Sequence, residues 1–221
     1  DAGASRDIEY WVEAAKLAEQ GRFDMLFKAD SQSTFGPDDL EVWKCTTSAV
    51  QLEPITLFTA LAMVTRHVGL VCTSSTTYND PFHVARFFAS LDRISAGRAG
   101  WNLVTSSAAS EALNFSYDAH VPHADRYERA HEFAQVVMGL WESWDRDAFL
   151  GDKERGLFFD PAKLHFLNHR GKHFKVRGPL TVMPSAQGRP VMVQAGQSEA
   201  GRELAAETAE VLFTVQPKIE P

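Results

Sequence analysis

The chain has 221 residues, of which 44% are hydrophobic and 23% are charged, and its formal net charge is −7. This length and composition fit one or two ordinary globular domains, and the acidic balance argues against a nucleic-acid platform or a polybasic membrane anchor. Two cysteines are too few for a disulfide framework. The sequence has no apolar run near the ~20 residues of a membrane span and no signal-peptide pattern. We therefore expect a cytoplasmic protein that acts on a small molecule.

The first half of the chain alternates between helical and buried-strand patterns. Helices are indicated where apolar residues recur three or four positions apart, and buried strands where a short apolar run is bounded by polar or turn residues. In chain order, we expect a helix over 8–20, a strand within 23–30, a polar loop over 31–53, a helix over 54–67, a strand over 68–72, a helix from 81 to a stop at 97 and a strand over 99–105.

The second half continues this alternation around one long polar insertion. Residues 145–189 are rich in Asp, Lys, Gly, His and Pro, which favours an insertion with short strands. The elements expected there are an irregular segment over 106–119, a helix over 122–144, the insertion, a strand over 191–195, a helix over 201–209 and a strand over 211–215.

Alternating helices and buried strands predict a parallel sheet with right-handed crossovers, which an open doubly wound sheet and a closed barrel both satisfy. The dinucleotide fingerprint, the P-loop and the nucleophile elbow are all absent from the sequence. In a parallel barrel the chemistry lies at the carboxyl ends of the strands. The polar residues at those ends are mostly neutral hydrogen-bonding groups, which suits a site that grips a cofactor. They are Asp30, Thr76, Thr77, Asn102, Thr105, Ser106, Gln194, Gln197, Ser198, Thr214 and Gln216.

Two local patterns each allow a binding interpretation and an ordinary structural one. The turn at residues 196–198 directly precedes a helix, so it could bind a phosphate on free backbone N–H groups, or it could be a common turn with Ser198 as the cap. His123 and Tyr127 are four residues apart and share one helix face, so they could border a flavin ring or phosphate, or simply begin a surface helix.

The histidines do not predict a metal site. Neither of their two groups has a cysteine or acidic partner at a recognised ligand spacing, so we expect no metal. The groups are His120 with His123, and His165 with His169 and His173.

A resemblance to a known family lies in residues 97–106, which read GRAGWNLVTS, and in residues 123–130, which read HADRYERA. Both are similar to segments of the bacterial-luciferase-like flavin monooxygenases and, more narrowly, of the branch with nitrilotriacetate, dibenzothiophene-sulfone and pristinamycin-type monooxygenases. Further similar segments follow in the family's order, so that the resemblance covers nearly all of the chain. They are residues 160–165, 176–180 and 187–196.

The resemblance implies an α/β fold, a TIM-type (β/α)₈ barrel of the luciferase-like kind. A complete barrel needs eight strands and ~250 residues, whereas about five strands are visible in this chain. We therefore expect residues 1–221 to form one incomplete barrel domain with an insertion at about 145–189. The first strand would precede residue 8 and the last strands would follow residue 221, which makes the chain a portion, or the ordered part, of a longer protein.

The resemblance also implies a two-component monooxygenase. Reduced FMN (FMNH2) would arrive from a separate NAD(P)H:flavin reductase, and a flavin hydroperoxide formed with O2 would oxygenate a small organic substrate, after which a C–N or C–S bond can break. A dry site is required, for which Phe27 and Trp101 are candidates.

The oligomeric state is left open, with a homodimer or larger assembly compatible with the family. Two alternatives stay open, a deazaflavin-dependent oxidoreductase on the same barrel and a flavin-binding protein without turnover.

The family's flavin-contacting positions are carried over onto matching residues of this sequence. Ser198 and its turn would take the phosphate, and Asn102 would lie beside the flavin ring system. His123 is also the catalytic candidate, because an imidazole titrates near neutrality and could manage a proton. The implied cofactor-binding set is Asp30, Thr76, Asn102, His123, Tyr127, Gly196, Gln197 and Ser198.

Overall fold

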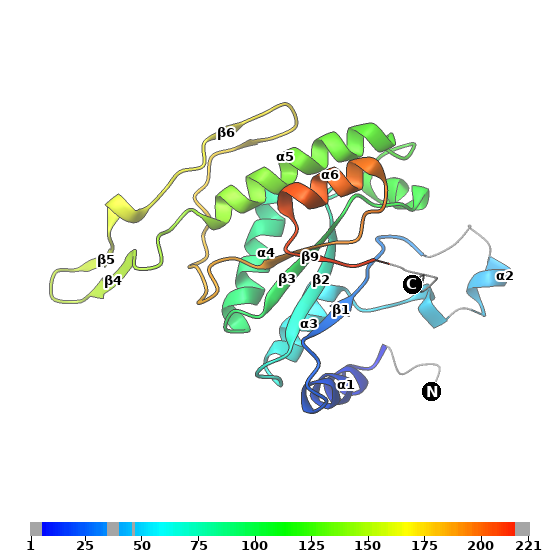
Figure 1. The fold of residues 1–221 in the computed structure, drawn as a ribbon, viewed down its shortest axis with the longest axis horizontal. Coiled ribbons are helices and arrows are strands. Elements are labelled where there is room, and N and C mark those ends of the chain that lie inside the picture. The colour runs from blue at the N-terminus through cyan, green and yellow to red at the C-terminus, as the bar shows by residue number, and fades with distance from the viewer. Residues whose placement is uncertain (1–5, 35–39, 46, 215–221) are drawn as a thin grey trace, which may run out of the picture.

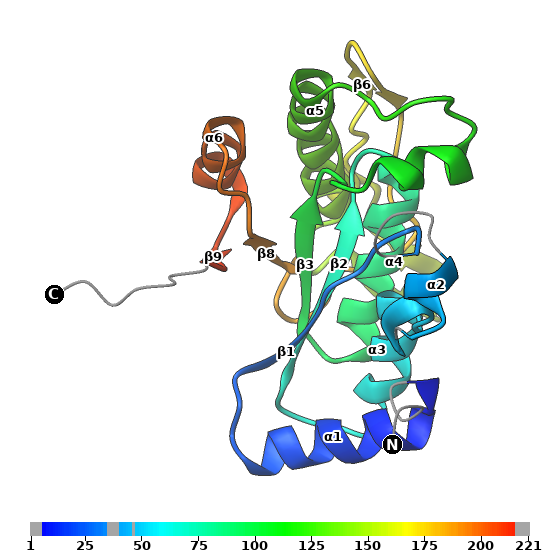
Figure 2. The ribbon, with the colours of Figure 1, turned by 90° about the vertical axis from the view of Figure 1, so that its right-hand side faces the viewer.

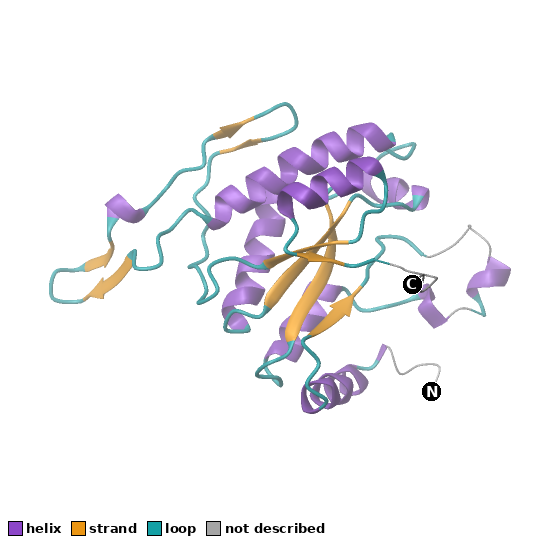
Figure 3. Ribbon diagram, viewed as in Figure 1, coloured by secondary structure: helices purple, strands orange, loops and turns teal. Residues whose placement is uncertain are grey.

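The computed structural model describes residues 6–34, 40–45 and 47–214. Its centre is a five-stranded sheet in which every neighbouring pair is parallel (Figures 1 and 3). Because all the pairings are parallel, the carboxyl ends of all five strands meet at one edge, and the strands follow one another across the sheet in chain order. In that order the strands are β1 (Met25–Lys28), β2 (Gly69–Ser75), β3 (Ala99–Val104), β8 (Val191–Gln194) and β9 (Val211–Leu212).

Four of the main helices connect these strands, α1 precedes β1, and α3, α4 and α5 lie on one side of the sheet (Figure 2). The starts of α1, α3, α4 and α6 are set by side chains that accept from free N–H groups of the first turn, such as Asp80 from Phe82 and Ser198 from Gly201, whereas α5 follows Pro122 without a side-chain cap. Within the described residues, no helix combines the length and apolar character needed to cross a bilayer. The helices are α1 (Ile8–Gln20), α3 (Pro54–Ala62), α4 (Pro81–Ile94), α5 (His123–Trp141) and α6 (Glu199–Thr208).

Helix α3 is shorter than the apolar spacing predicts, because Arg98 takes the carbonyl groups that would continue it. The guanidinium of Arg98 donates to the carbonyl oxygens of Ala62 (3.0 Å), Thr65 (3.2 Å) and Val68 (2.8 Å). The prediction of a helix to residue 67 is therefore wrong by five residues. Helix α6 begins two residues earlier than predicted, because Ser198 is its N-cap.

The connecting segments contain more local structure than their polar composition predicts. The segment 31–53 is wrongly predicted as loop throughout, since it holds α2 (Leu40–Trp43) and a 3₁₀ turn, η2 (Thr47–Ala49). The segment 106–119 holds a 3₁₀ helix, η3 (Ala109–Phe115). All three elements are too short for a periodic pattern to reveal. The last strand was predicted over 211–215, and Val215 lies outside the described residues.

The insertion forms two antiparallel hairpins, as its composition predicts. One pairs β4 (Phe149–Asp152) with β5 (Leu157–Phe159), and the other pairs β6 (His169–Arg170) with β7 (Lys175–Val176). A 3₁₀ turn, η4 (Pro161–Lys163), lies between them. Figure 1 shows the first hairpin projecting away from the sheet, while the second follows α5.

An aromatic cluster fills the layer between the sheet and the helices. The ring of Trp101 on β3 is completely buried and lies 5.8 to 6.2 Å, centroid to centroid, from the rings of Phe88, Phe133 and Trp141. Its indole N–H donates to the carbonyl of Ser74 at 3.0 Å. Trp101 therefore belongs to the core, and the expectation that it borders the reaction site is wrong.

The other face of the sheet is concave, with its two edge strands brought towards each other. Phe27 on β1 and Phe213, just after β9, stack at 5.7 Å between ring centroids although three strands separate them in the sheet. Gly100 lies on this face, where a Cβ would come within 3.0 Å of a methyl group of Val71. This close approach explains why the strand carries glycine there.

Candidate functional site

A cavity of about 440 Å³ opens at the carboxyl ends of the parallel strands. This volume lies in the range of pockets that hold cofactors and drug-sized ligands. Its walls come from four strand ends, from the loop that leads to η3 and from the first turns of α5 and α6. The strand-end residues include Asp30, Thr73, Ser75, Ser106, Gln194 and Gly196.

At one end of the cavity, the turn after β8 meets helix α5. The hydroxyl of Ser198 donates to the phenolic oxygen of Tyr127 at 3.3 Å and accepts from the N–H of Gly201 at 3.1 Å. The exposed ring of His123 packs on Tyr127 with 4.7 Å between centroids. Polar groups from two distant segments thus converge beside the N-terminus of α6, where backbone N–H groups favour an anion.

Two glycines allow this convergence. A Cβ on Gly196 would lie 3.0 Å from the Cα of Gly201, and a Cβ on Gly201 would lie 3.0 Å from the hydroxyl of Tyr127. A Cβ contact of 3.0 Å is tighter than nearly all real ones, so glycine at both positions lets the turn and the helix approach without displacing their neighbours. Gly196 is part of the turn pattern at residues 196–198, whereas Gly201 lies beyond that pattern and has no sequence signal for a role in the site.

At the other end, a buried carboxylate joins the strand ends. Glu111 on η3 accepts from the hydroxyl of Ser31 at 3.0 Å and from that of Ser106 at 2.5 Å. Ser106 also shares a hydrogen bond with Ser75 at 2.6 Å, and Arg126 donates to its carbonyl oxygen. Sequence reasoning missed Glu111 and Arg126, because a single charge in a polar loop or a helix start carries no spacing signal.

The family described as "Luciferase-like monooxygenase" matches residues 1–220 of this chain. The chain belongs to this family. It is 54% identical over 217 residues to the N-acetyl-S-(2-succino)cysteine monooxygenase of Bacillus subtilis (strain 168), covering 98% of this chain and 48% of that protein.

A second relative and a solved structure are also similar to this chain. The chain is 53% identical over 216 residues to nitrilotriacetate monooxygenase component A of Aminobacter aminovorans, covering 95% of this chain and 48% of that protein. Among solved structures, a riboflavin lyase described with modified FMN and riboflavin has a TM-score of 0.85 and 37% identity, covering 94% of this chain and 47% of that chain. The chain spans about half the length of the curated relatives it matches.

The family's fold agrees with the architecture described above. Five parallel strands in chain order, with helices on one side and a concave face on the other, correspond to part of a TIM-type (β/α)₈ barrel. The predicted fold class, an incomplete luciferase-like barrel with about five of the eight strands, is therefore confirmed.

The structure brings together most, but not all, of the cofactor-binding residues that the family resemblance implies. The cavity is lined by Asp30, His123, Tyr127, Gly196 and Ser198. The remaining three, Thr76, Asn102 and Gln197, are not among its lining residues, and the roles of all eight stay predictions.

The three residues outside the lining have distinct surroundings. The hydroxyl of Thr76 donates to the carbonyl of Val104 at 3.2 Å, and Gln197 is exposed. Asn102 donates its amide to the hydroxyl of Thr73, a lining residue, at 2.8 Å. Its carbonyl oxygen Oδ1 is buried without a partner in the described structure, so Asn102 stands directly behind the cavity wall with one acceptor unused.

The carboxyl group of Asp30 is the lining group with a clearly altered acidity. Burial raises its pKa to about 6, and the nearby carboxylates of Glu53 and Glu111 act in the same direction. The ammonium of Lys28 and the N–H of Ser31 oppose this effect without cancelling it. Asp30 can therefore exchange a proton close to neutral pH.

The histidines of the chain are not assembled into a metal centre. Across the described ranges, no group of three or more His, Cys, Asp or Glu side chains is placed to hold a metal ion. Two histidines of the insertion instead pair with acidic residues of α5, His169 with Glu132 at 2.9 Å and His173 with Glu128 at 3.3 Å, while His165 pairs with Asp145 at 2.9 Å.

Proposed function

We propose that the protein containing this chain is a flavin-dependent monooxygenase that uses reduced FMN and O2 to oxygenate a small organic molecule. The observation that carries this proposal is the cavity at the strand ends, where Ser198, Tyr127 and His123 converge from two separate elements. Family membership supports it, as does the structural likeness to an FMN-associated protein. The cavity offers neutral hydrogen-bonding groups at its margins, as a cofactor-based reaction requires.

The residues present fit FMN. A phosphate is doubly acidic, and the end of the cavity beside α6 offers the Tyr127 and Ser198 hydroxyls, the backbone at Gly196 and the exposed ring of His123. The buried Oδ1 of Asn102 is a further acceptor for a ring N–H that reaches the wall. When bound, reduced FMN supplies the electrons that activate O2.

The chain's own residues would hold the cofactor, shield it and manage protons. His123 is placed to donate a hydrogen bond or transfer a proton at the cavity margin, and the raised pKa of Asp30 makes it a second proton-exchange group. Trp101 belongs to the core, so Phe27 on the concave face is the candidate that stays for shielding the cofactor, although it is not among the lining residues of the cavity.

The proposal extends to partners, location and domain organisation. A relative called component A supports a system in which a separate NAD(P)H:flavin reductase supplies the reduced FMN. We place the protein in the cytoplasm, where that reductant is available.

We further propose that residues 1–221 form one barrel domain, incomplete in this chain, with the insertion at about 145–189. The five strands belong to one continuous sheet, and the relatives are about twice as long as this chain.

The test is an anaerobic titration of the full-length protein with reduced FMN, followed by a pulse of oxygen under absorbance monitoring. We expect saturable binding and a return of the oxidised-FMN absorbance that is much slower than for free reduced FMN. Return at the rate of free flavin would contradict the monooxygenase proposal. Turnover with a reduced deazaflavin in the absence of oxygen would favour the hydride-transfer alternative on the same barrel.

A further inference from the structure

The segment after β1 and the helix η3 are joined by three side-chain contacts over a short distance. Ser31 donates to Glu111, as described above, and the amide of Asn114 donates to the carbonyl of Gln32 at 2.8 Å. The third contact is a shared hydrogen bond at 2.8 Å between the hydroxyls of Ser33 and Ser110. We name these contacts between residues 31–33 and residues 110–114 the loop clasp.

Glu111 is the centre of the loop clasp, because its second oxygen reaches the other strand ends. Ser106 has one hydroxyl hydrogen, which it donates to Glu111, so its bond with Ser75 requires Ser75 to donate. Ser75 in turn accepts from the N–H of Thr77 at 3.1 Å. Every hydrogen in this series of hydrogen bonds points toward the Glu111 carboxylate. The series ties together the carboxyl ends of β1, β2 and β3.

The surroundings of Glu111 favour a positioning role. Its exposed fraction is 4%, and among the described residues it forms no ion pair with a basic side chain. Burying a carboxylate is costly, and hydroxyl donors compensate for it only in part. Arg126, the nearby basic residue of the cavity wall, binds the carbonyl oxygens of Thr105 and Ser106 instead. In the described structure, the side-chain partners of the Glu111 carboxyl group are thus hydroxyls of the segments on either side of it, as expected of a group that holds those segments together.

We propose that Glu111 is a positioning residue that closes the cavity wall between the segment after β1 and the segment after β3. The inference rests on the proposed function. Ser31, Ser106 and Glu111 all line the cavity, so their hydrogen bonds are part of its wall, and we expect release of the carboxylate to loosen that wall and admit water. An oxygen-activating site has to exclude water, because a leaked intermediate yields only hydrogen peroxide. The loop clasp therefore protects the reaction without touching the end of the cavity beside α6. We call that end the phosphate end, because the FMN phosphate is proposed to bind there.

The proposal is tested on the full-length protein with reduced FMN as the probe. The variants Glu111→Gln and Ser31→Ala each weaken the clasp, while Ser31→Thr keeps the hydroxyl. Glu13→Gln, on the exposed face of α1, is the matched control. The measurements are the rate at which the oxidised-FMN absorbance returns after an oxygen pulse, the yield of hydrogen peroxide, the Kd for oxidised FMN and the melting temperature.

We expect Glu111→Gln and Ser31→Ala to speed the return of oxidised FMN by about tenfold, the effect of losing one hydrogen bond to a charged group. The Kd for FMN should stay within about twofold, and Ser31→Thr and Glu13→Gln should match the wild type. A merely structural role would shift the melting temperature and Kd together. If Glu111→Gln does not fold, the Ser31 pair decides.

The outcomes separate this inference from the proposed function. If the wild type binds reduced FMN and delays its oxidation, but the clasp variants delay it equally, the role of Glu111 is overturned and the proposed function stands. If the wild type neither binds reduced FMN nor delays its oxidation, the proposed function fails and this inference fails with it.

Discussion

The hydroxyl of Ser198 donates to the phenolic oxygen of Tyr127 across 3.3 Å, and this contact joins the turn after β8 to helix α5. The two residues are 71 positions apart in the chain. Ser198 uses the same oxygen to cap α6 through the N–H of Gly201. One hydroxyl thus fixes both the start of α6 and the position of the Tyr127 side chain at this end of the cavity.

Removing the Tyr127 hydroxyl should weaken FMN binding without weakening riboflavin binding. Tyr127→Phe keeps the ring that packs on His123 and keeps the cap of α6, but it deletes one donor at the phosphate end. We expect the Kd for FMN to rise about tenfold, the effect of one hydrogen bond to a charged group. Titration by flavin fluorescence measures both ligands.

Ser198→Ala serves as the comparison in the same titration. It removes the phosphate-end hydroxyl and the N-cap together, so it should also cost about 1 kcal/mol of stability. An equal loss of affinity for FMN and riboflavin in Tyr127→Phe would show that the phosphate binds elsewhere.

Gly201→Ala should disrupt the same end of the cavity by steric means. The new Cβ would lie 3.0 Å from the Tyr127 hydroxyl and 3.1 Å from the Cα of Gly196. Alanine is otherwise the better helix former, so only the close approach predicts a loss. We expect a loss of about 1–3 kcal/mol in stability, as for other overpacked sites, together with weaker FMN binding. Denaturant unfolding measures the first, and Ala200→Gly, one position earlier in α6, is the control for helix propensity.

The extent to which sequence predicted this molecule depends on the range of the interactions. Helix α1 matches its predicted bounds, because its apolar spacing, its Asp7 cap and the stop at Gly21 are all local. The end of α3 does not, because Arg98 captures its carbonyl groups from 36 residues away. The sequence around Trp101 is the same whichever face of β3 its side chain occupies. Only the structure therefore assigns Trp101 to the core.

The candidate site divides in the same way. The turn at 196–198 and the pair His123 and Tyr127 have local patterns, and the structure places Ser198, Tyr127 and His123 at one cavity. Glu111 has no such pattern, because its partners Ser31 and Ser106 meet it only through the fold. Family resemblance suggested a set of positions for contacts with flavin, and those positions stay predictions; it suggested no residue of the loop clasp.

Asp30 should make the protein less stable as the pH rises towards neutrality. Its pKa is about 6 in the folded chain, against 3.8 for an ordinary aspartate. Because the folded state holds the proton more tightly, stability falls as the pH rises from about 4 to about 6, and the penalty is complete above that. Asp30→Asn should therefore stabilise the protein at about pH 7 by on the order of 1 kcal/mol, after allowing for solvent screening of a half-buried group.

Urea unfolding of the wild type and of Asp30→Asn at about pH 4 and about pH 7 checks this expectation. The difference in stability between the two proteins should grow with pH, because the variant lacks the ionisation that the folded state disfavours. Asp24→Asn, at an exposed position before β1, is the matched control. A difference that is constant across this pH range would mean that Asp30 ionises normally.

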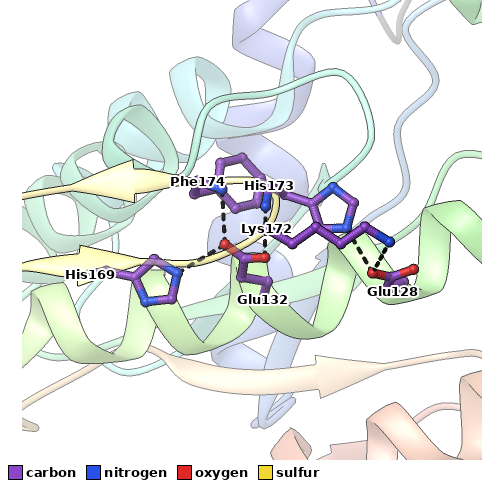
Figure 4. Close-up of polar contacts among 6 residues, drawn as sticks. All are labelled: Glu128, Glu132, His169, Lys172, His173 and Phe174. Carbon is purple, nitrogen blue, oxygen red and sulfur yellow. Dashed lines mark hydrogen bonds and ion pairs between the residues drawn. The ribbon is translucent and has the colours of Figure 1, made fainter.

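Glu132 should hold the hairpin of β6 and β7 on α5 far more strongly than its neighbour Glu128 does. Figure 4 shows Glu132 receiving hydrogen bonds from the ring of His169 (2.9 Å) and from the backbone N–H groups of His173 (2.9 Å) and Phe174 (2.8 Å). Burial opposes ionisation, but these donors prevail and lower the pKa of Glu132 to about 2. The stabilisation is therefore present above about pH 4.5 and is lost as the pH falls towards about 2.

Hydrogen exchange of the hairpin amides in Glu132→Gln tests this attachment. Losing the charge-assisted bonds should cost about 2 kcal/mol locally, so the amides of His173 and Phe174 should exchange about 30-fold faster. Glu128 joins the same helix to the same hairpin, but only through solvent-accessible pairs with Lys172 and His173. In Glu128→Gln the exchange rates of the hairpin amides should therefore change by no more than about twofold. Equal effects of the two substitutions would contradict the prediction, because surface charge alone would then account for the docking of the hairpin.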